Sequence, residues 1–285
     1  MTDATESVLK VHYGTPGILA NIVAGLEKGG KTIDTALPAD LKGVDEFHMG
    51  GVPATMHFME TMEFCEDDQV LDAGCGIGGV ARDIAAKFKV ASIDGVDLTP
   101  EYVEVGNEIN SWPLIKESFL GGVCPKLQQG SILSLPYPDA SFTKIVMMHV
   151  GMNIEDKETL FREFGRVLKP GGRVGVYDIM RLRQGVDLPY PMPWSSAPET
   201  SFVQTPAHYL ACMEGAGLVV KMMDNRREAT MQILAKQVAA MKEGATNPIQ
   251  LGILMGETGP AKGANASRMV KECVIGPIEL ISSKL

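Results

Sequence analysis

Residues 70–79, VLDAGCGIGG, decide the fold of this 285-residue chain. Their apolar beginning predicts a short strand, and the glycines lead directly into GVARDIAAKF at 79–88, which has helical spacing. A strand that runs into glycines and then opens a helix presents bare backbone amides and a helix N-terminus to a ligand. Such an arrangement suits a nucleotide-like molecule, so the glycine loop is the centre of the predicted binding site.

Strands alternate with helices on the C-terminal side of the loop. The further strands are predicted at 91–98, 126–130, 142–150 and 173–180. The helices that separate them are predicted at 100–110 and 156–168, and KPGG at 169–172 is predicted to be a turn. Strands that alternate with helices of this length predict parallel βαβ units and an open α/β sheet.

The alternation stops after Arg181. Residues 186–202 hold four prolines, too many for a helix or a central strand, and they predict a long ordered loop of the kind that often binds ligands. The chain is then predicted to continue with a helix at 206–217, a strand at 218–224, a helical segment at 226–271 with a glycine-rich break at 252–263, and a last strand at 275–283.

Composition excludes several classes of protein. The hydrophobic share of 45% and the charged share of 21% are near globular averages, so the chain is neither disordered nor fibrous. The net charge of −9 argues against a nucleic-acid partner. No apolar run reaches the roughly 18 residues of a membrane span, and the start, MTDATESVLK, lacks a signal-peptide pattern, so we expect a cytoplasmic protein. The five cysteines are scattered, which predicts neither disulfides nor a metal site.

The glycine pattern by itself fits two classes of cofactor. One interpretation takes Gly74, Gly76 and Gly79 as the GxGxxG of dinucleotide enzymes. The other takes Gly78 in place of Gly79, which gives the GxGxG of S-adenosylmethionine enzymes. Asp97, at the end of the next strand, is compatible with both, because an acid at this distance binds ribose hydroxyls in either class.

Asp72 favours the second interpretation, because a carboxylate directly before the loop attracts an ammonium group and repels a pyrophosphate. The stretches QQGSILSLPYPDASF at 128–142 and REFGRVLKPGGRVGVYD at 162–178 follow in order. With these motifs the chain resembles the class I S-adenosylmethionine-dependent methyltransferases of the small-molecule type. It is similar to ubiquinone/menaquinone and tocopherol C-methyltransferases, and more closely to sarcosine/dimethylglycine N-methyltransferases. The narrower similarity rests on DEFHMGG at 45–51, MNIEDK at 152–157 and YDIMR at 177–181.

The resemblance implies a Rossmann-like α/β fold with a seven-stranded, mostly parallel sheet, an antiparallel last strand, helices on both faces and a helical cover. We expect residues 1–67 to form an N-terminal cover segment, with its clearest helix at 53–63, and residues 68–224 to form the cofactor-binding core. Residues 225–274 are expected to be a helical lid insertion, and residues 275–285 to return to the core as its last strand.

The resemblance also implies which residues bind S-adenosylmethionine, with S-adenosylhomocysteine as the product. Asp72 and the loop glycines match the part that holds the methionine end of the cofactor, and Asp97 matches the acid that binds both ribose hydroxyls. Ser131 stands where the family usually has an aspartate for the adenine amino group. The predicted cofactor-binding residues are Asp72, Gly74, Cys75, Gly76, Gly78, Asp97, Leu98, Ser131, Ile132 and Met148.

The methyl acceptor would lie at the carboxyl ends of the strands. His149 is the first choice for contact with the acceptor or for a base, and Tyr13 and His48 are the other predicted catalytic residues. Aromatic rings would attract a cationic acceptor and an arginine would bind a carboxylate. The predicted substrate-binding residues are Asn153, which replaces a histidine of many relatives, Tyr177, Trp194 and Arg181.

The leading hypothesis is therefore methyl transfer to a small metabolite, and in particular N-methylation of a small amine of the sarcosine or dimethylglycine kind. O-, S- or C-methylation of a phenol, a quinone precursor or a thiol is an alternative, because neighbouring subgroups share these motifs. A nicotinamide-dependent dehydrogenase and a non-catalytic module that binds S-adenosylmethionine are more remote alternatives. The expected partner is a small-molecule acceptor, and the oligomeric state, with a homodimer among the options, stays open.

Overall fold

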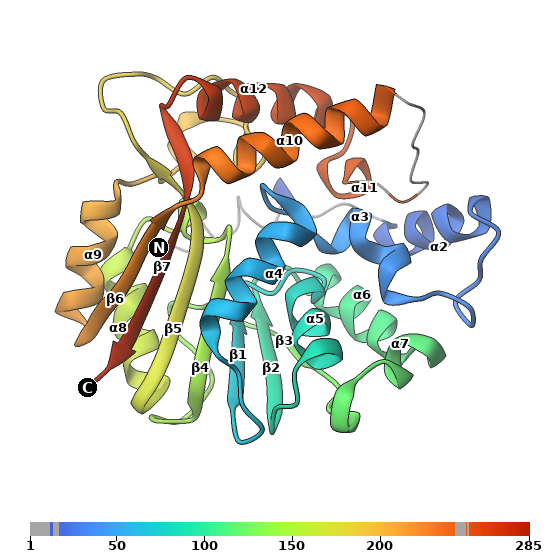
Figure 1. Ribbon diagram of the computed structural model, residues 1–285, viewed down its shortest axis with the longest axis horizontal. Coiled ribbons are helices and arrows are strands. Elements are labelled where there is room, and N and C mark those ends of the chain that lie inside the picture. Colours follow the sequence, from blue (N-terminus) through green and yellow to red (C-terminus); the bar gives the residue numbers. More distant parts are fainter. Residues whose placement is uncertain (1–11, 14–16, 243–248, 250) are drawn as a thin grey trace.

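Seven strands form one sheet in the order β3, β2, β1, β4, β5, β7, β6 (Figure 1). The computed structural model describes residues 12–13, 17–242, 249 and 251–285, and predictions for the other residues lie outside this described part. The strands are β1 (Gln69–Ala73), β2 (Ser92–Asp97), β3 (Lys126–Gln129), β4 (Phe142–Met148), β5 (Leu168–Arg181), β6 (Leu218–Asn225) and β7 (Ile275–Lys284). Each of the seven overlaps a strand that the sequence predicts.

The strand directions confirm a mostly parallel sheet with an antiparallel last strand. Neighbouring strands among β1 to β5 are parallel, whereas β7 is antiparallel to both β5 and β6. β1 lies between β2 and β4, so the strand order reverses at β1. Sheets of this type open a ligand-binding crevice at the carboxyl ends of the strands beside such a reversal. The glycine loop follows β1 and therefore lies at this crevice.

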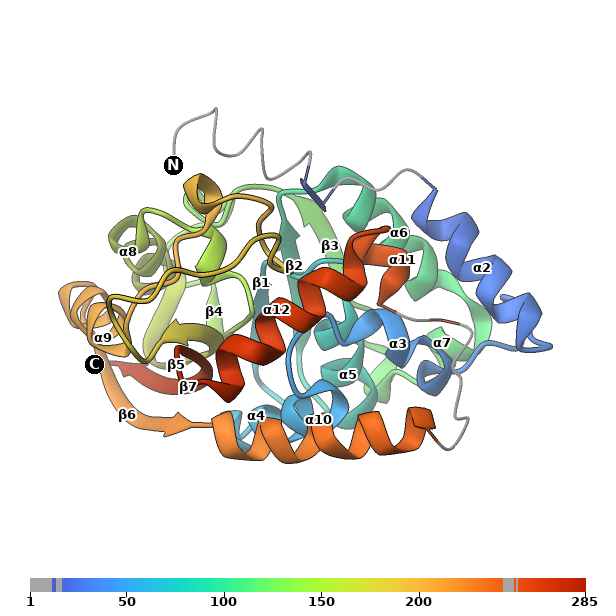
Figure 2. The same ribbon diagram turned by 90° about the horizontal axis from the view of Figure 1, so that it is seen from above.

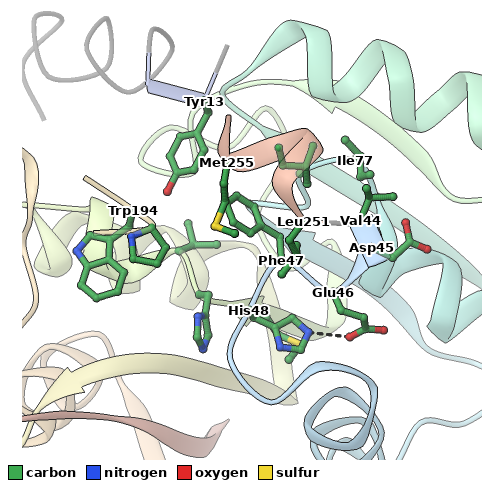
Figure 3. Close-up of a pocket in the computed structure, with 18 of the residues that line it drawn as sticks. Tyr13, Val44, Asp45, Glu46, Phe47, His48, Ile77, Trp194, Leu251 and Met255 are labelled. Carbon is green, nitrogen blue, oxygen red and sulfur yellow. Dashed lines mark ion pairs between the residues drawn. The ribbon is translucent and has the colours of Figure 1, made fainter. Parts of the chain in front are cut away.

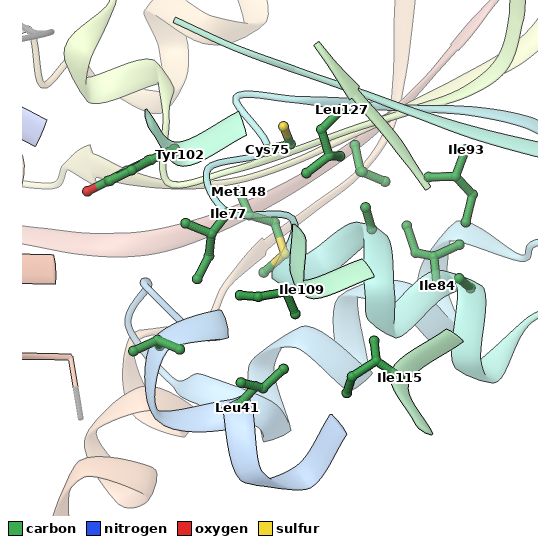
Figure 4. Close-up of a cluster of buried hydrophobic side chains, with 14 of the residues drawn as sticks. Leu41, Cys75, Ile77, Ile84, Ile93, Tyr102, Ile109, Ile115, Leu127 and Met148 are labelled. Atoms are coloured by element: carbon green, nitrogen blue, oxygen red, sulfur yellow. The ribbon is translucent and has the colours of Figure 1, made fainter. Parts of the chain in front are cut away.

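Helices cover both faces of the sheet, as the resemblance implies (Figure 1). The helices of one face are α2 (Ile18–Lys28), α4 (Gly51–Met62), α5 (Gly79–Lys87), α6 (Pro100–Ser111) and α7 (Pro113–Glu117). The opposite face carries α8 (Lys157–Val167) and α9 (Pro206–Gly215). Buried side chains such as Ile84, Ile109 and Leu127 join α5 and α6 to the sheet (Figure 4). Because each such side chain stabilises the fold by about 1.5–3 kcal/mol, this packing fixes the helix that the glycine loop opens.

KPGG at 169–172 is not the free turn that the sequence predicts, because it lies within β5. β5 has three more residues than β4 between the paired positions Leu168 and Arg173, and this surplus forms a bulge. Gly171 has a φ of 76°, which glycine adopts without steric cost. The strand therefore continues through the four residues instead of beginning after them.

The helices of the cover lie above the edge of the sheet at which the parallel strands end (Figure 1, Figure 2). They are α10 (Arg227–Lys242), α11 (Gly252–Met255) and α12 (Gly259–Lys271). The predicted glycine-rich break at 252–263 is wrong in extent, because only residues 256–258 separate α11 from α12. Glycine costs a helix about 1 kcal/mol, and α12 offsets this cost by packing Ala266 and Met269 in an apolar cluster with Trp194. No helix in the described part of the chain is long and apolar enough to span a membrane.

Candidate active site

A cavity of about 1260 Å³ lies between the carboxyl ends of the parallel strands and the cover (Figure 3). Its volume exceeds the roughly 300–1,000 Å³ of ordinary ligand pockets, so the cavity has room for a nucleotide-sized molecule and a second ligand. The loops after β1, β2, β3 and β4 line its sheet side. Residues around 42–52, the proline-rich loop and parts of 251–267 line its cover side.

The glycine loop turns tightly at the end of β1. Gly74, Gly76 and Gly78 have φ values of 78°, 54° and 83°, in a region that costs other residues about 1–2 kcal/mol. The Gly74 amide donates a hydrogen bond to the Val96 carbonyl at 2.8 Å, which ties the loop to β2. A Cβ atom on Gly74 would lie 2.7 Å from Cγ1 of Val150, so a larger residue does not fit. Gly74 and Gly76 line the cavity, whereas Gly78 lies outside its lining and precedes α5.

Asp97 holds the loop from the end of β2. Its Oδ2 accepts a hydrogen bond from the Gly76 amide at 2.8 Å, and its Oδ1 accepts one from the Thr99 amide at 2.9 Å. Burial raises the pKa of Asp97, although these hydrogen bonds act in the opposite direction. Asp97 and Leu98 both line the cavity. Asp97 therefore lies at the cavity, and its contact with a ribose stays a prediction.

Asp72 presents a buried carboxyl oxygen that nothing in the described part of the chain satisfies. The residue is 2% exposed and lines the cavity, and its Oδ2 has no hydrogen-bond partner. Burial, and then the charge of Asp97, raise the pKa of Asp72 to about 7. A buried unpaired polar atom costs about 1–3 kcal/mol, so the site favours a ligand that brings an ammonium group or another donor to this oxygen.

The remaining predicted cofactor residues line the same side of the cavity. They are Cys75, Ser131, Ile132 and Met148, from the ends of β1, β3 and β4. Burial raises the pKa of the Cys75 thiol well above its usual range, so Cys75 is a packing group and not a nucleophile. The Ser131 hydroxyl accepts a hydrogen bond from the Leu133 amide at 3.3 Å. All the predicted cofactor residues except Gly78 thus line the cavity, and the roles of the individual residues stay predictions.

His149 follows β4 with a φ of 54°, in the left-handed region that few non-glycine residues adopt. Its amide donates to the Tyr177 carbonyl at 2.8 Å, and its ring stacks on the Tyr177 ring with 5.5 Å between the centroids. His149 lines the cavity, and its Nε2 is buried without a hydrogen-bond partner. Burial, and then the charge of His48, lower the pKa of His149 well below its usual value. The imidazole is therefore neutral at pH 7.

His48 belongs to a buried polar group at the cavity wall. Its Nε2 lies 2.9 Å from Oε2 of Glu46 and 2.8 Å from the Thr55 hydroxyl, and its ring lies 5.7 Å from the His149 ring. Burial raises the pKa of Glu46, but the hydrogen bond and charge of His48 and the charge of Lys42 outweigh burial and lower that pKa to about 2. Glu46 is therefore a carboxylate that fixes the orientation of the His48 ring (Figure 3).

Tyr13, from the N-terminal segment, lines the cavity. Asn153, in the short helix η3 (Gly151–Asn153), donates from Nδ2 to the Tyr13 hydroxyl at 2.8 Å. The Tyr13 ring centroid lies 6.2 Å from those of both Phe47 and Tyr102. Burial raises the pKa of Tyr13, so its hydroxyl stays protonated. The Tyr102 hydroxyl and Oδ1 of Asn153 are buried without partners at this end of the cavity.

Two of the predicted substrate-binding residues do not reach the cavity. Tyr177 lies behind the His149 ring, and its hydroxyl donates to the Met49 carbonyl at 3.2 Å. Arg181 donates from Nη1 to the Val186 carbonyl at 2.9 Å, which directs its charge to the proline-rich loop. The other two predicted substrate-binding residues, a tryptophan in that loop and the asparagine of η3, do line the cavity.

Several lining residues were missed by the sequence analysis. They are Lys42, Asp45, Glu46, Phe47, Tyr102, Leu234 and Leu251. Tyr102 had a usable signal, because it lies in the first turn of the helix that follows the strand ending at Asp97. Asp45, Glu46 and Phe47 lie in DEFHMGG at 45–51, whereas Lys42, Leu234 and Leu251 had no signal, because only the packing of the cover brings them to the cavity. Within the described residues, no three His, Cys, Asp or Glu side chains are grouped as ligands for a metal ion.

Comparison with known proteins identifies the class of the sheet core. Residues 71–176 match the family described as a methyltransferase domain. This finding confirms the resemblance that the motifs carry and favours the GxGxG interpretation of the glycine loop.

Two similar curated proteins act on different acceptors. Phosphoethanolamine N-methyltransferase 1 of Arabidopsis thaliana is 35% identical over 133 residues, which are 46% of this chain and 25% of that protein. Sterol 4-C-methyltransferase strm-1 of Caenorhabditis elegans is 34% identical over 125 residues, which are 44% of this chain and 35% of that protein. The matched stretch spans about a quarter to a third of these relatives.

Solved structures share the fold at low sequence identity. Phosphoethanolamine N-methyltransferase 2 of Haemonchus contortus has a TM-score of 0.65 and 16% identity, with 92% of this chain and 60% of that chain covered. Geranyl diphosphate C-methyltransferase of Streptomyces coelicolor A3(2), in complex with S-adenosylhomocysteine, has a TM-score of 0.61 and 18% identity, with 82% and 79% covered. The fold is therefore the Rossmann-like methyltransferase fold.

Proposed function

We propose that this protein transfers the methyl group of S-adenosylmethionine to a small-molecule acceptor, and that the accepting atom is an amine nitrogen. One observation carries the proposal. A single cavity holds the glycine loop with the unpartnered carboxyl oxygen of Asp72 on one side, and the neutral, unpartnered imidazole of His149 on the other.

The residues of the cofactor side fit S-adenosylmethionine. Asp72 would bind the ammonium group, the tight turn at Gly74 would let the backbone approach the methionine part, and Asp97 would accept the ribose hydroxyls. When bound, the cofactor supplies a methyl group on a positively charged sulfur. Alignment of the acceptor and exclusion of water then provide much of the acceleration of such a displacement.

An amine acceptor suits the charges of the cavity. The nitrogen lone pair forms the N–C bond while the S–C bond breaks and its electron pair stays on sulfur, so the positive charge passes to nitrogen. His149 is neutral, so it does not repel this charge, and with the ring proton on Nδ1 its Nε2 can accept a hydrogen bond from the amine N–H and thereby orient the lone pair. No proton has to leave during the step, which agrees with a histidine whose pKa is too low for a strong base.

Binding and turnover together test this proposal. S-adenosylhomocysteine should bind in a calorimetric titration and raise the melting temperature, whereas NADH should do neither. The substitution Asp97→Asn should weaken binding at least tenfold, because a buried charge-assisted contact is lost. Asp94→Asn, on the same strand but outside the cavity lining, is the matched control and should leave the affinity unchanged.

Labelled methyl transfer to a panel of amines, phenols and thiols then identifies the accepting atom. Transfer to amines alone supports the proposal, and preferential transfer to phenols, thiols or carbon acceptors contradicts its amine part. Saturable binding of S-adenosylhomocysteine without transfer to any acceptor would instead indicate a non-catalytic binding module.

A further inference from the structure

We infer that the methyl acceptor carries an apolar body and no carboxylate or phosphate group, a narrowing that rests on the function proposed above. The inference separates this protein from an enzyme for small zwitterions such as sarcosine. It depends on three features of the cavity, namely the apolar walls of its cover side, the hydrogen bond that already occupies the indole N–H of Trp194, and the charge of the lining.

The first feature is the wall itself. Large apolar side chains from four separate segments face the cavity, and Figure 3 shows several of them directed into the same space. They are Phe47, Met152, Trp194, Leu234, Leu251 and Met255. A short amino acid would leave the partly exposed members of this wall, Phe47, Leu234, Leu251 and Met255, in contact with water, whereas an apolar acceptor would bury their surface at about 25 cal/mol per Å². Methionine side chains also adapt to the shape of a ligand.

The second feature is that the indole N–H of Trp194, the largest residue of the wall, already donates a hydrogen bond. Nε1 of Trp194 donates a hydrogen bond to the Ser201 hydroxyl at 2.9 Å, within the proline-rich loop. The residue is 2% exposed and packs in an apolar cluster with Met152 and Met269. The indole is therefore packed within the wall and offers the cavity no free donor for an anionic group.

The third feature is the charge of the lining. Its acids are Asp45, Glu46, Asp72 and Asp97. Lys42 is the one lysine or arginine among the described lining residues, and its Nζ lies 2.5 Å from Asp83 and 3.2 Å from Glu46. Arg181, which the sequence analysis assigned to an acceptor carboxylate, points elsewhere. An acceptor carboxylate or phosphate would meet acids without a free cation, and an unpaired buried charge is costly.

The size of the cavity agrees with these features. Its volume of about 1260 Å³ exceeds what one nucleotide-sized ligand needs, and residues around 42–52, the proline-rich loop and parts of 251–267 line its cover side. The apolar body would then lie under α11 and against the proline-rich loop, with the nitrogen at His149. The acceptor would thus be an amine, neutral when it reacts, on an alkyl or ring system.

Calorimetry on the whole protein saturated with S-adenosylhomocysteine tests this inference. N-methylbutylamine, N-methylhexylamine and N-methyloctylamine should bind with increasing affinity, by about fourfold for each added methylene, which is the gain expected for a buried CH₂. Sarcosine and phosphoethanolamine should bind at least a hundredfold more weakly than the octyl compound. The substitution Met255→Ala should reduce the dependence on chain length and leave the affinity for S-adenosylhomocysteine unchanged.

Met223→Ala is the matched control, because Met223 is 55% exposed on β6 and lies outside the cavity lining. This variant should keep the full dependence on chain length. The inference would be overturned if sarcosine or phosphoethanolamine bound more tightly than the octyl compound, or if affinity did not depend on chain length. It would also be overturned if Met255→Ala left that dependence as unchanged as Met223→Ala does. The proposed function would survive those results if methyl transfer to an amine is measured, and it would fail separately if S-adenosylhomocysteine does not bind.

Discussion

The two sides of the cavity are built in different ways. Most of the cofactor side comes from one stretch of about thirty residues, 70–98, to which Ser131, Ile132 and Met148 add. Its key contacts are made by backbone amides, left-handed glycines and two carboxylates at strand ends. The acceptor side is made of side chains that five distant segments bring together, among them Tyr13, Phe47, His149 and Trp194. The comparison teaches that a short motif can specify the first side, whereas the second depends on how the cover packs.

Removing the ion pair that joins the two sides of the cavity should have the largest effect, which is a loss in the free energy of unfolding. The Arg82 guanidinium is 3% exposed, pairs with Asp45 of the cover, and donates to the Ile77 carbonyl of the glycine loop at 2.7 Å. The substitution Arg82→Met leaves a buried carboxylate without a partner, so we expect a loss of about 3–5 kcal/mol in the free energy of unfolding, measured with urea. Arg162→Met, at an exposed position on α8, should change it by less than about 0.5 kcal/mol. A loss below about 1 kcal/mol for Arg82→Met would mean that the two sides are not joined by this pair.

Gly74→Ala should weaken ligand binding on the cofactor side and leave the acceptor side unchanged. The substitution combines the strain of a φ of 78° with a clash against Val150, so we expect affinity for S-adenosylhomocysteine to fall about 30- to 100-fold in a calorimetric titration. Gly171→Ala is the control, because Gly171 has a φ of 76° but open space around it. Equal losses of affinity in both variants would show that backbone strain, and not the fit of the loop, determines binding.

Most of the fold could be predicted because its signals are local. Apolar runs, helical periodicity and glycines placed all seven strands, and the resemblance supplied the antiparallel direction of β7. The extent of β5 was missed because KPGG at 169–172 has turn composition but forms a bulge. The break at 252–263 was overestimated, because packing of α12 against the proline-rich loop outweighs the low helix propensity of its glycines.

The cofactor side was the more predictable, although Tyr13, His48, His149, Asn153 and Trp194 of the acceptor side also line the cavity. The sequence analysis placed Asp72, Gly74 and Asp97 at the cavity because each adjoins the end of a strand in the glycine motif. It also placed Tyr177 and Arg181 there, although one packs behind a histidine ring and the other binds a backbone carbonyl. The direction of such side chains depends on neighbours that are distant in sequence, and neither spacing nor composition reports those neighbours.

His149→Asn should affect the acceptor side alone. Asparagine tolerates the left-handed backbone of this position, so the fold should be kept while the ring nitrogen is lost. We expect kcat to fall about tenfold, which corresponds to one lost hydrogen bond, with affinity for S-adenosylhomocysteine within twofold of the parent. His208→Asn, on α9 and outside the cavity lining, should leave both quantities unchanged. A parallel loss of affinity would assign His149 to the cofactor side.

The change in cofactor affinity with pH should be the smallest of the predicted effects. Burial and the charge of Asp97 raise the pKa of Asp72 to about 7 in the free protein. Because an exposed aspartate has a pKa of about 3.9, the folded state retains a proton that the unfolded chain has lost, so the free protein becomes less stable as pH rises from about 4 to 7.

A bound ammonium group favours the carboxylate form of Asp72 and would lower the pKa of Asp72. If it does so by one unit, the affinity for S-adenosylhomocysteine should rise about fivefold between pH 6 and pH 8. Calorimetric titrations at these pH values should show that Asp72→Asn removes the rise, since the ligand's own ionisation is the same in both proteins. A rise of equal size in the variant would assign the titration to another group and would leave Asp72 without its proposed role on the cofactor side.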